Sequence, residues 1–386
     1  MYNFNFQNPT QIIFGKDRLD EISKHIPEGV KVLILFGGGS AKKYGTLEKV
    51  KTSLPKRVLF EFGGIEPNPR YETLMKAVEL VKKHEIEFLL AVGGGSVIDG
   101  TKFISMASTC SEHESLTLLH RGAGAIPITK ALPIGVVLTL PATGSEMNAF
   151  AVISHGDSKY AVMSPLTYPK FSILDPSLTF TLPATQVANG VADAFVHVIE
   201  QYVTFPVNAS FQDSMAEGIL RNLIEIGRKT IDNPADYDLR ANLMWNATMA
   251  LNGLVGSGVP QDWSVHTIGH ELTALFGVDH AKSLAIVLPS LWQIRKEKKR
   301  KKLIRFAEKV WGIDEENDEI KIDLAISKTR EFFESLGIKT RLSDYGILDT
   351  DIDKVIYGLK SKGFNALSET NDLTLDISRK ILENAL

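Results

Sequence analysis

The first 182 residues alternate short apolar runs with stretches of helical periodicity. Runs of this length, bounded by glycine or polar residues, are typical of strands buried on both faces of a sheet. They predict strands at Val32–Phe36, Val58–Phe62, Phe88–Val92 and Ile134–Leu140. The apolar spacing within Thr73–Lys83 predicts a helix. Because strands that alternate with helices form βαβ units, we expect an α/β nucleotide-binding domain with a mostly parallel sheet over residues 1–182.

Beyond Leu182 the strand signals almost vanish and helical periodicity dominates, with Pro183 at the join. Helices are predicted at Thr185–Tyr202, Ser210–Arg228, Leu239–Leu254, Val265–Phe276, Leu303–Val310 and Ile322–Leu336. A chain of 386 residues has room for about two domains of roughly 100–200 residues each. The second domain, residues 183–386, is therefore expected to be all-helical.

The formal net charge of -3 gives no reason to expect binding to nucleic acid or to an anionic membrane. One basic run, Arg295–Lys302, interrupts this picture. Since the rest of the chain is acidic on balance, we interpret the run as a solvated helix end. The single cysteine, Cys110, excludes an intrachain disulfide, and the N-terminus lacks a signal-peptide pattern. No apolar run reaches the roughly 18 residues of a membrane span, so a cytoplasmic protein is expected.

Two of the predicted strands end in the same tetrapeptide, at Gly37–Ser40 and at Gly93–Ser96. Glycine lets the backbone approach a ligand closely, and the start of the following helix offers unpaired N–H groups to a phosphate. We assign the second copy to a cofactor pyrophosphate and the first to the adenosine ribose. A third glycine-containing turn lies at Pro141–Glu146. Neither tetrapeptide matches G-x-G-x-x-G, so plain tight βα turns remain the alternative.

The residues after the first tetrapeptide bear on the choice of cofactor. NAD sites usually place a carboxylate on the ribose 2′-hydroxyl, whereas a 2′-phosphate needs donors and positive charge. Gly39 and Ser40 supply no carboxylate, and Lys42 and Lys43 follow. The sequence therefore favours NADP(H), with NAD still possible.

The helical half contains two carboxylate or histidine pairs at helical spacing. Asp193 and His197 are four residues apart on an apolar helix, as are His266 and His270, and His280 follows after Gly277. A buried aspartate is costly unless it is paired or binds a metal, and carboxylate with imidazole suits iron or zinc. The alternatives are a simple Asp–His pair and histidines satisfied within the core. The H-x-x-x-H spacing lacks the glutamate of the H-E-x-x-H proteases.

An ordered series of motifs runs through both halves: Phe14–Lys16, Phe36–Ser40, Gly63–Pro69, Gly93–Lys102, Pro141–Glu146, Gly190–His197, His266–Glu271 and Asp279–His280. With these motifs the chain resembles the iron-dependent (group III) alcohol dehydrogenases, in particular the branch of butanol dehydrogenases and NADPH-dependent aldehyde reductases. The resemblance implies the dehydroquinate synthase-like fold, and in many members a homodimer, for which Ile12–Phe14 is the candidate edge strand.

The resemblance also implies roles for individual residues. The implied ligands of one divalent metal, Fe²⁺ or Zn²⁺, are Asp193, His197, His266 and His280. His270 is implied to lie beside the metal and the nicotinamide without binding the metal. Many NAD-using relatives have an aspartate at the position of Gly39, in agreement with NADP(H). The cofactor-binding residues expected from the glycine turns and the resemblance are Gly38, Gly39, Ser40, Asn68, Gly94, Gly95, Ser96, Asp99, Thr139, Thr143, Asn148 and Lys159.

The implied function is hydride transfer between NADP(H) and a small aliphatic aldehyde or primary alcohol, such as butanal or butanol. The same fold also carries glycerol dehydrogenases and dehydroquinate synthases, which need a polar substrate pocket. The side chains expected near the substrate here are apolar instead, namely Met147, Phe150, Trp263 and Phe276. A non-enzymatic nucleotide sensor is the remaining alternative, and it would need no metal ligands.

Overall fold

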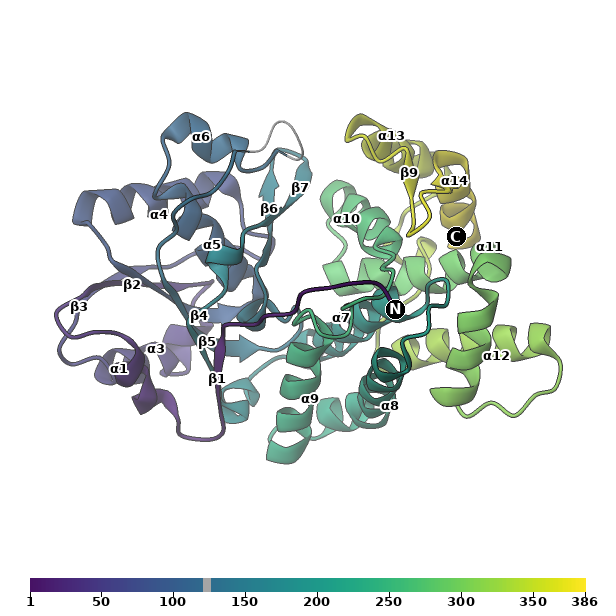
Figure 1. Ribbon diagram of the computed structural model, residues 1–386, viewed down its shortest axis with the longest axis horizontal. Coiled ribbons are helices and arrows are strands. Elements are labelled where there is room, and N and C mark those ends of the chain that lie inside the picture. The colour runs from purple at the N-terminus through teal and green to yellow at the C-terminus, as the bar shows by residue number, and fades with distance from the viewer. Residues whose placement is uncertain (121–125) are drawn as a thin grey trace. The chain divides into compact units, whose positions relative to one another are not determined.

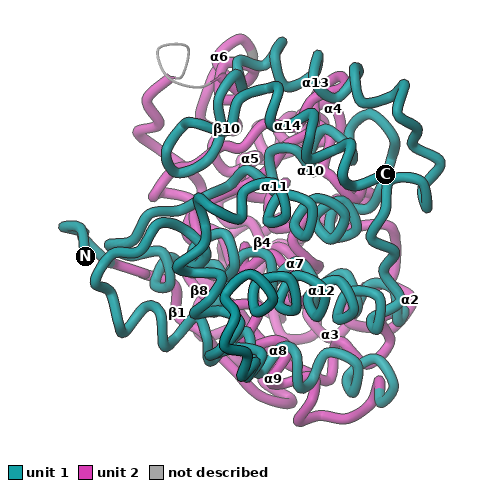
Figure 2. Tube along the Cα trace, turned by 90° about the vertical axis from the view of Figure 1, so that its right-hand side faces the viewer, with its two compact units in different colours: residues 1–6, 183–233, 249–386 teal, residues 7–182, 234–248 magenta. Residues whose placement is uncertain are grey.

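The computed structural model describes residues 1–120 and 126–386 and divides into two compact units. Residues 7–182 and 234–248 form the α/β unit, whereas residues 1–6, 183–233 and 249–386 form the helical unit (Figures 1 and 2). The division falls after Leu182, but the first six residues and residues 234–248 depart from a simple two-part chain. The N-terminal segment joins the helical unit through the hydrogen bond from Tyr2 N to Gly258 O, 2.9 Å long.

A six-stranded, fully parallel sheet forms the centre of the α/β unit, in the order β1-β8-β5-β4-β2-β3 (Figure 1). Its strands are β1 (Gln11–Phe14), β2 (Lys31–Phe36), β3 (Val58–Phe62), β4 (Phe88–Gly94), β5 (Ile134–Leu140) and β8 (Phe171–Leu174). The four strands predicted from apolar runs are confirmed as β2 to β5. Because β1 and β8 are only four residues long, their patterns were too short to predict from periodicity. A separate antiparallel hairpin, β6 (Phe150–His155) with β7 (Ser158–Met163), was also not predicted.

Alternate residues of each central strand face opposite sides of the sheet, as a pleated strand requires. Leu33 and Leu35 of β2 belong to the core under α4 (Tyr71–His84) and α5 (Gly95–Ala107). Val32 and Ile34 belong to the opposite core. That side is covered by α1 (Ile22–His25) and α3 (Thr46–Thr52). The remaining helices of the unit are α2 (Ser40–Lys43), α6 (Glu112–Thr117) and α9 (Tyr237–Ala250), whose last residues belong to the helical unit. The predicted α/β domain, covered on both faces, is confirmed.

The sheet order places a switch point between β2 and β4. The chain runs from β2 outward to β3 and then returns to β4 on the other side of β2. In doubly wound sheets, ligands bind at the carboxyl ends of strands at such a point. Both glycine tetrapeptides lie there, directly after β2 and at the end of β4.

The helical unit is built on five long helices and two shorter ones near the C-terminus. These are α7 (Ala184–Tyr202), α8 (Ser210–Asp232), α10 (Ser264–Phe276), α11 (His280–Lys309), α12 (Asp318–Ser335), α13 (Ile352–Ser361) and α14 (Leu375–Asn384), with the last turn of α9. A two-residue antiparallel pair, β9 (Ala366–Leu367) and β10 (Leu373–Thr374), adds a small hairpin. Short 3-10 helices lie at Leu19–Glu21, Ser145–Met147, Pro165–Thr167, Pro176–Thr179, Ser343–Tyr345 and Asp349–Asp351. None of the helices in the described parts of the chain is long and apolar enough to cross a bilayer.

Helix α11 differs most from its prediction. Only Leu303–Val310 was expected to be helical, whereas the helix begins at His280. Its first half is buried nearly all round and contains Pro289, so it lacks the one-sided pattern of an amphipathic helix. The interpretation of Arg295–Lys302 as a solvated helix end is only partly correct, because Lys298 and Lys301 are exposed but the run lies inside α11 and three of its residues are not solvated. Arg295, Lys299 and Lys302 are all buried and paired with carboxylates.

Candidate functional site

Helix α7 presents three acidic or imidazole side chains along one buried face. Asp193, His197 and Glu200 are spaced four and three residues apart, which places them above one another on a helix. All three are buried, with 3%, 4% and 3% of their surface exposed. The rest of the helix is almost entirely apolar, so this polar face must be satisfied from outside the helix.

Two further histidines come from the ends of α10 and α11. His266 is the third residue of α10, and His280 is the first residue of α11. Between them Gly277 adopts a left-handed conformation (φ 68°) and ends α10, so the chain can turn back into α11. This local turn brings His280 close to His266, with ring centroids 5.2 Å apart.

The histidines meet at one carboxylate oxygen. Asp193 Oδ1 lies 3.6 Å from Nε2 of His197, 3.8 Å from Nε2 of His266 and 3.6 Å from Nε2 of His280. The rings of His197 and His266 are stacked, with centroids 4.8 Å apart. The four residues implied as metal ligands therefore come together within one unit of the chain.

These residues fit a divalent metal ion. Asp193 Oδ1 and His266 Nε2 are buried without a hydrogen-bond partner in the protein, which is costly unless another group satisfies them. The candidate ligand atoms of Asp193, His266 and His280 all lie within 4.8 Å of one another. A tetrahedral ion with bonds of about 2.0–2.1 Å places its ligands roughly 3.3 Å apart, only slightly closer than the Asp–His distances here. Three imidazoles with one carboxylate suit zinc or iron.

Glu200 completes the site and was not predicted. Its carboxylate contacts His266 Nδ1 directly, which leaves Nε2 directed toward Asp193. A carboxylate behind a ligand histidine fixes the tautomer and the ring orientation. The signal for this residue was present in the sequence, since Glu200 continues the spacing of Asp193 and His197 along the same helix face. Its partner His266, however, lies 66 residues away.

The electrostatics of the Asp–His cluster favour a cation. Burial alone would raise the pKa of the Asp193 carboxyl, but His197 and the other two rings hold that pKa well below its usual range. Burial lowers the pKa of His197 to about 4 against the pull of Asp193. Burial also opposes the charge of His266, yet the Glu200 carboxylate and Asp193 raise its pKa to about 9. A metal that binds His266 must therefore displace a proton, so we expect weaker metal binding as the pH falls.

His270 lies one turn beyond His266 on α10. Its ring centroid is 6.1 Å from that of His266 and 5.0 Å from that of His280. Trp263 covers another side of the Asp–His cluster. Its ring centroid is 5.4 Å from that of His266, in an edge-on arrangement. Of the apolar residues expected near the substrate, Trp263 and Phe276 belong to the helical unit and Met147 and Phe150 to the α/β unit.

In the α/β unit, several predicted cofactor residues gather around the second tetrapeptide. Asn68, which has a positive φ of 57°, donates its N–H to Ser96 Oγ at 3.3 Å. Lys159, on β7, donates to Asn68 Oδ1 at 2.9 Å. Ser96 itself lies in the first turn of α5, which begins at Gly95 directly after β4. An ammonium, an amide and a helix start thus lie together, as phosphate binding requires.

The glycines of this turn are required by close packing. A Cβ added at Gly95 would lie 2.5 Å from the side chain of Thr143, and one added at Gly94 would lie 2.9 Å from that of Leu140. Thr143 belongs to the turn after β5, and Thr139 is the last residue but one of that strand. The turns after β4 and β5 therefore pack closely against each other. They lie at the carboxyl ends of these strands, where a nucleotide is expected.

A buried polar network joins the third glycine-containing turn, Pro141–Glu146, to α5. Asp99 lies inside α5 and accepts hydrogen bonds from Ser145 Oγ (2.6 Å) and from Val152 N (2.8 Å). Lys102, one turn later, donates to Ser145 Oγ, Asn148 Oδ1 and Phe150 O at 2.7–3.0 Å. Burial lowers the pKa of the Lys102 ammonium to about 8 despite the nearby Asp99 and Glu146. Asp99 therefore orders the third glycine-containing turn from within the protein. Lys102 was not predicted as a site residue. The sequence nevertheless places it three residues after Asp99, on the same side of the predicted helix.

The middle of the first tetrapeptide, Gly38 and Gly39, lies in open space. A Cβ at Gly38 or Gly39 would meet no atom within 4 Å. Gly39 has a φ of 112° and precedes Ser40, the first residue of α2. Lys42 on α2 lies 3.7 Å from Glu61 and over the ring of Phe36. The room and the neighbouring positive charge at this turn agree with a phosphate rather than a bare hydroxyl.

Glycine turns at the switch point of a parallel sheet, combined with a buried Asp–His cluster in a helical unit, are the features of a metal-dependent, nucleotide-linked enzyme. The profile described as "Iron-containing alcohol dehydrogenase" matches residues 9–176, and its C-terminal counterpart, "Fe-containing alcohol dehydrogenase family, C-terminal", matches residues 187–366. The chain belongs to the iron-containing alcohol dehydrogenase family.

Known relatives extend over the whole chain. The NADPH-dependent aldehyde reductase YqhD of Escherichia coli is 54% identical over 100% of both chains. The NADH-dependent butanol dehydrogenase B of Clostridium acetobutylicum is 40% identical over 92% of both. The crystal structure of E. coli YqhD superposes with a TM-score of 0.97 at 53% identity, over 100% of this chain and 99% of that one. The butanol dehydrogenase A of Thermotoga maritima gives a TM-score of 0.92 at 37% identity, over 100% and 99%.

Proposed function

We propose that this protein is a metal-dependent alcohol dehydrogenase or aldehyde reductase that transfers hydride between NADP(H) and a small aliphatic aldehyde or primary alcohol. The observation that carries the proposal is the meeting of three histidine Nε2 atoms at Asp193 Oδ1, 3.6–3.8 Å away. Relatives named as NADPH-dependent aldehyde reductase and butanol dehydrogenase support the substrate class. A pure nucleotide sensor would not need this buried cluster.

In this proposal, Asp193, His197, His266 and His280 hold one divalent cation, Fe²⁺ or Zn²⁺. When bound, the cation supplies a Lewis acid for the carbonyl oxygen and the nicotinamide supplies the hydride. The protein's own groups set the geometry. Glu200 keeps His266 in the tautomer whose Nε2 has a lone pair for the metal. Asp193 contributes the negative charge that balances the cation.

The direct test is an anaerobic assay of the metal-reconstituted protein with butanal. We expect NADPH to be oxidised, NADH to be used more slowly, and activity to disappear after chelation. Absence of turnover with any short aliphatic aldehyde would contradict the proposed function. A clear preference for NADH would contradict only the choice of cofactor.

The cofactor choice can be tested at Gly39. In Gly39→Asp a carboxylate would face the 2′-phosphate, and like-charge contact should raise the KM for NADPH about tenfold or more. The KM for NADH should change less, so the measured ratio of kcat/KM values shifts toward NADH. Because Gly39 has a positive φ of 112°, any side chain there is strained. Gly39→Ala is the matched control for that strain, and an equal shift in both variants would argue against the charge effect.

His270 is assigned to proton transfer. Its ring lies beside those of His266 and His280, and an imidazole has an unperturbed pKa near neutrality. We expect His270→Ala to retain its metal but to lose about 10²–10⁴-fold in kcat, the usual contribution of a general acid. Metal content and kcat should be measured on the same preparation. Unchanged turnover would remove His270 from the relay.

A homodimer that pairs through β1 is part of the proposal. Strand β1 lies at one end of the sheet order, bonded to β8. An edge strand of this kind offers backbone N–H and C=O groups to a second strand. Light scattering after gel filtration tests this, with Ile12→Pro as the variant expected to yield monomer.

A further inference from the structure

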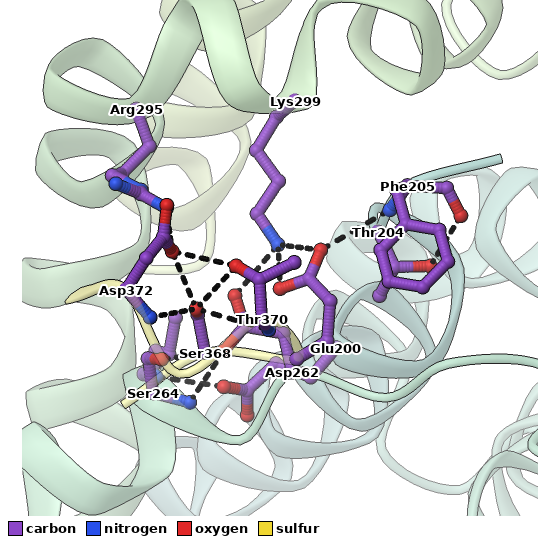
Figure 3. A network of polar contacts seen from close by, with 12 residues as sticks. Glu200, Thr204, Phe205, Asp262, Ser264, Arg295, Lys299, Ser368, Thr370 and Asp372 are labelled. Carbon is purple, nitrogen blue, oxygen red and sulfur yellow. Dashed lines mark hydrogen bonds and ion pairs between the residues drawn. The ribbon is translucent and has the colours of Figure 1, made fainter. Parts of the chain in front are cut away.

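Lys299, on α11, is an ammonium buried inside the helical unit. Its side chain is only 2% exposed. Nζ lies 2.7 Å from Asp262 Oδ2 (Figure 3). It also lies 2.8 Å from both carboxylate oxygens of Glu369. Removing such charges from water costs several kcal/mol per ion unless the geometry is good, so a cluster of this kind calls for a reason beyond stability.

Asp262, the first partner of Lys299, fixes the start of α10. Its Oδ1 accepts hydrogen bonds from the backbone N (2.9 Å) and the hydroxyl of Ser264, the first residue of that helix. Its own N–H donates to the backbone oxygen of Glu200 on α7 at 2.7 Å. The backbone N–H and Oδ1 of Asp262 are both engaged in these hydrogen bonds. Oδ2 is therefore the atom that accepts a hydrogen bond from Lys299.

The turn that Asp262 fixes is the one that carries His266. Glu200 Oε1 accepts from the backbone N–H of Val265 (2.7 Å) and of His266 (3.4 Å), and Oε2 contacts His266 Nδ1. The position of His266 Nε2, 3.8 Å from Asp193 Oδ1, therefore depends on the first turn of α10. A small displacement of that turn would move a candidate metal ligand directly.

Glu369, the second partner of Lys299, ties the same ammonium to the end of α7. It lies between β9 and β10, and its Oε1 accepts the backbone N–H of Phe205 at 3.1 Å, three residues after α7 ends at Tyr202. Lys299 thus links the entry of α10 to the exit of α7, the two helices that supply Asp193, His197 and His266.

We propose that Lys299 is a positioning residue of the metal centre: through Asp262 it holds the first turn of α10 so that His266 Nε2 stays directed at the metal. The inference rests on the metal centre of the proposed function and adds to it a residue that touches neither metal nor substrate. Lys299 acts on the metal centre indirectly, through the carboxylate of Asp262 and the first turn of α10.

The test is the metal affinity of the full-length Lys299→Met variant. The proteins are freed of metal, and the Kd for Zn²⁺ is measured by competition with a chromophoric chelator, then for Fe²⁺ without oxygen. We expect Lys299→Met to bind about tenfold more weakly than the wild type, the lower end of the roughly 10–100-fold effect of losing a group bonded directly to a ligand histidine. Lys298→Met is the matched control, since Lys298 is 65% exposed and pairs with Asp372 at 3.2 Å. It should keep the wild-type Kd.

A second variant keeps the inference testable if Lys299→Met does not fold. Asp262→Asn retains an oxygen for the N–H of Ser264 but loses the charge toward Lys299, so its metal affinity should fall in the same direction. A purely structural role would lower the melting temperature of the metal-free protein and leave the Kd unchanged. A wild-type Kd in the folded variants would overturn the inference and leave the proposed function standing. Failure of the wild type itself to bind Zn²⁺ or Fe²⁺ would overturn both.

Discussion

Replacing His266 with alanine is expected to abolish metal retention and turnover together. His266 Nε2 is one of the three imidazole nitrogens directed at Asp193 Oδ1 and is buried without a protein partner. Without it the remaining ligands cannot complete a tetrahedral set. Lewis-acid stabilisation is worth several kcal/mol, so kcat should fall by about 10³-fold or more. Metal content after dialysis and kcat with butanal and NADPH are the measurements.

His84→Ala is the control for this experiment. His84 ends α4 in the α/β unit and packs against Phe60, so its loss should leave the metal content unchanged. A His266→Ala protein that kept full activity with no bound metal would show that the Asp–His cluster has another purpose. Loss of metal with full activity retained on other substrates would separate the cluster from catalysis altogether.

Replacing Phe195 with alanine is expected to cause the largest loss of stability, about 3–5 kcal/mol. Phe195 is fully buried and packs against Phe332 and Phe333, with ring centroids 5.3 and 5.6 Å away. It lies two residues from Asp193, so the two side chains point about 160° apart, on nearly opposite sides of α7. The aromatic cluster on one side of α7 therefore holds the face with the proposed metal ligands in place on the other.

The free energy of unfolding of the metal-free protein, from a denaturant titration followed by circular dichroism, measures this loss. Metal must be absent because binding would add its own stabilisation. Phe211→Ala on α8 is the control, since Phe211 is 64% exposed and such surface changes usually stay within about 0.5 kcal/mol. A Phe195→Ala protein as stable as the Phe211→Ala protein would mean that α7 is held by other contacts.

Much of the candidate metal centre was predictable because its information is local. Asp193 and His197 share a helix face whatever surrounds the helix, since the period of a helix fixes that relation. The glycine turns were predictable for the same reason: a strand followed by glycines and a helix is read from adjacent residues. The central strands β2 to β5 were likewise identified by their own apolar runs.

The contacts that join distant segments were not predictable from these local patterns. Glu200 could be placed on the ligand face, but its pairing with His266 required α10 to lie against α7. Lys102 gained its role only when the turn after β5 folded over α5.

The sequence by itself determined the class of each half, the carboxylate and imidazole set, and the glycine turns, because each depends on the period of one helix or strand. Only the tertiary structure decided that Lys299, in a run of charges typical of a solvated surface, is buried between Asp262 and Glu369. Those carboxylates lie 37 and 70 residues away along the chain. Whether a charge is solvated or buried depends on the partners that folding brings to it, and no local pattern contains them.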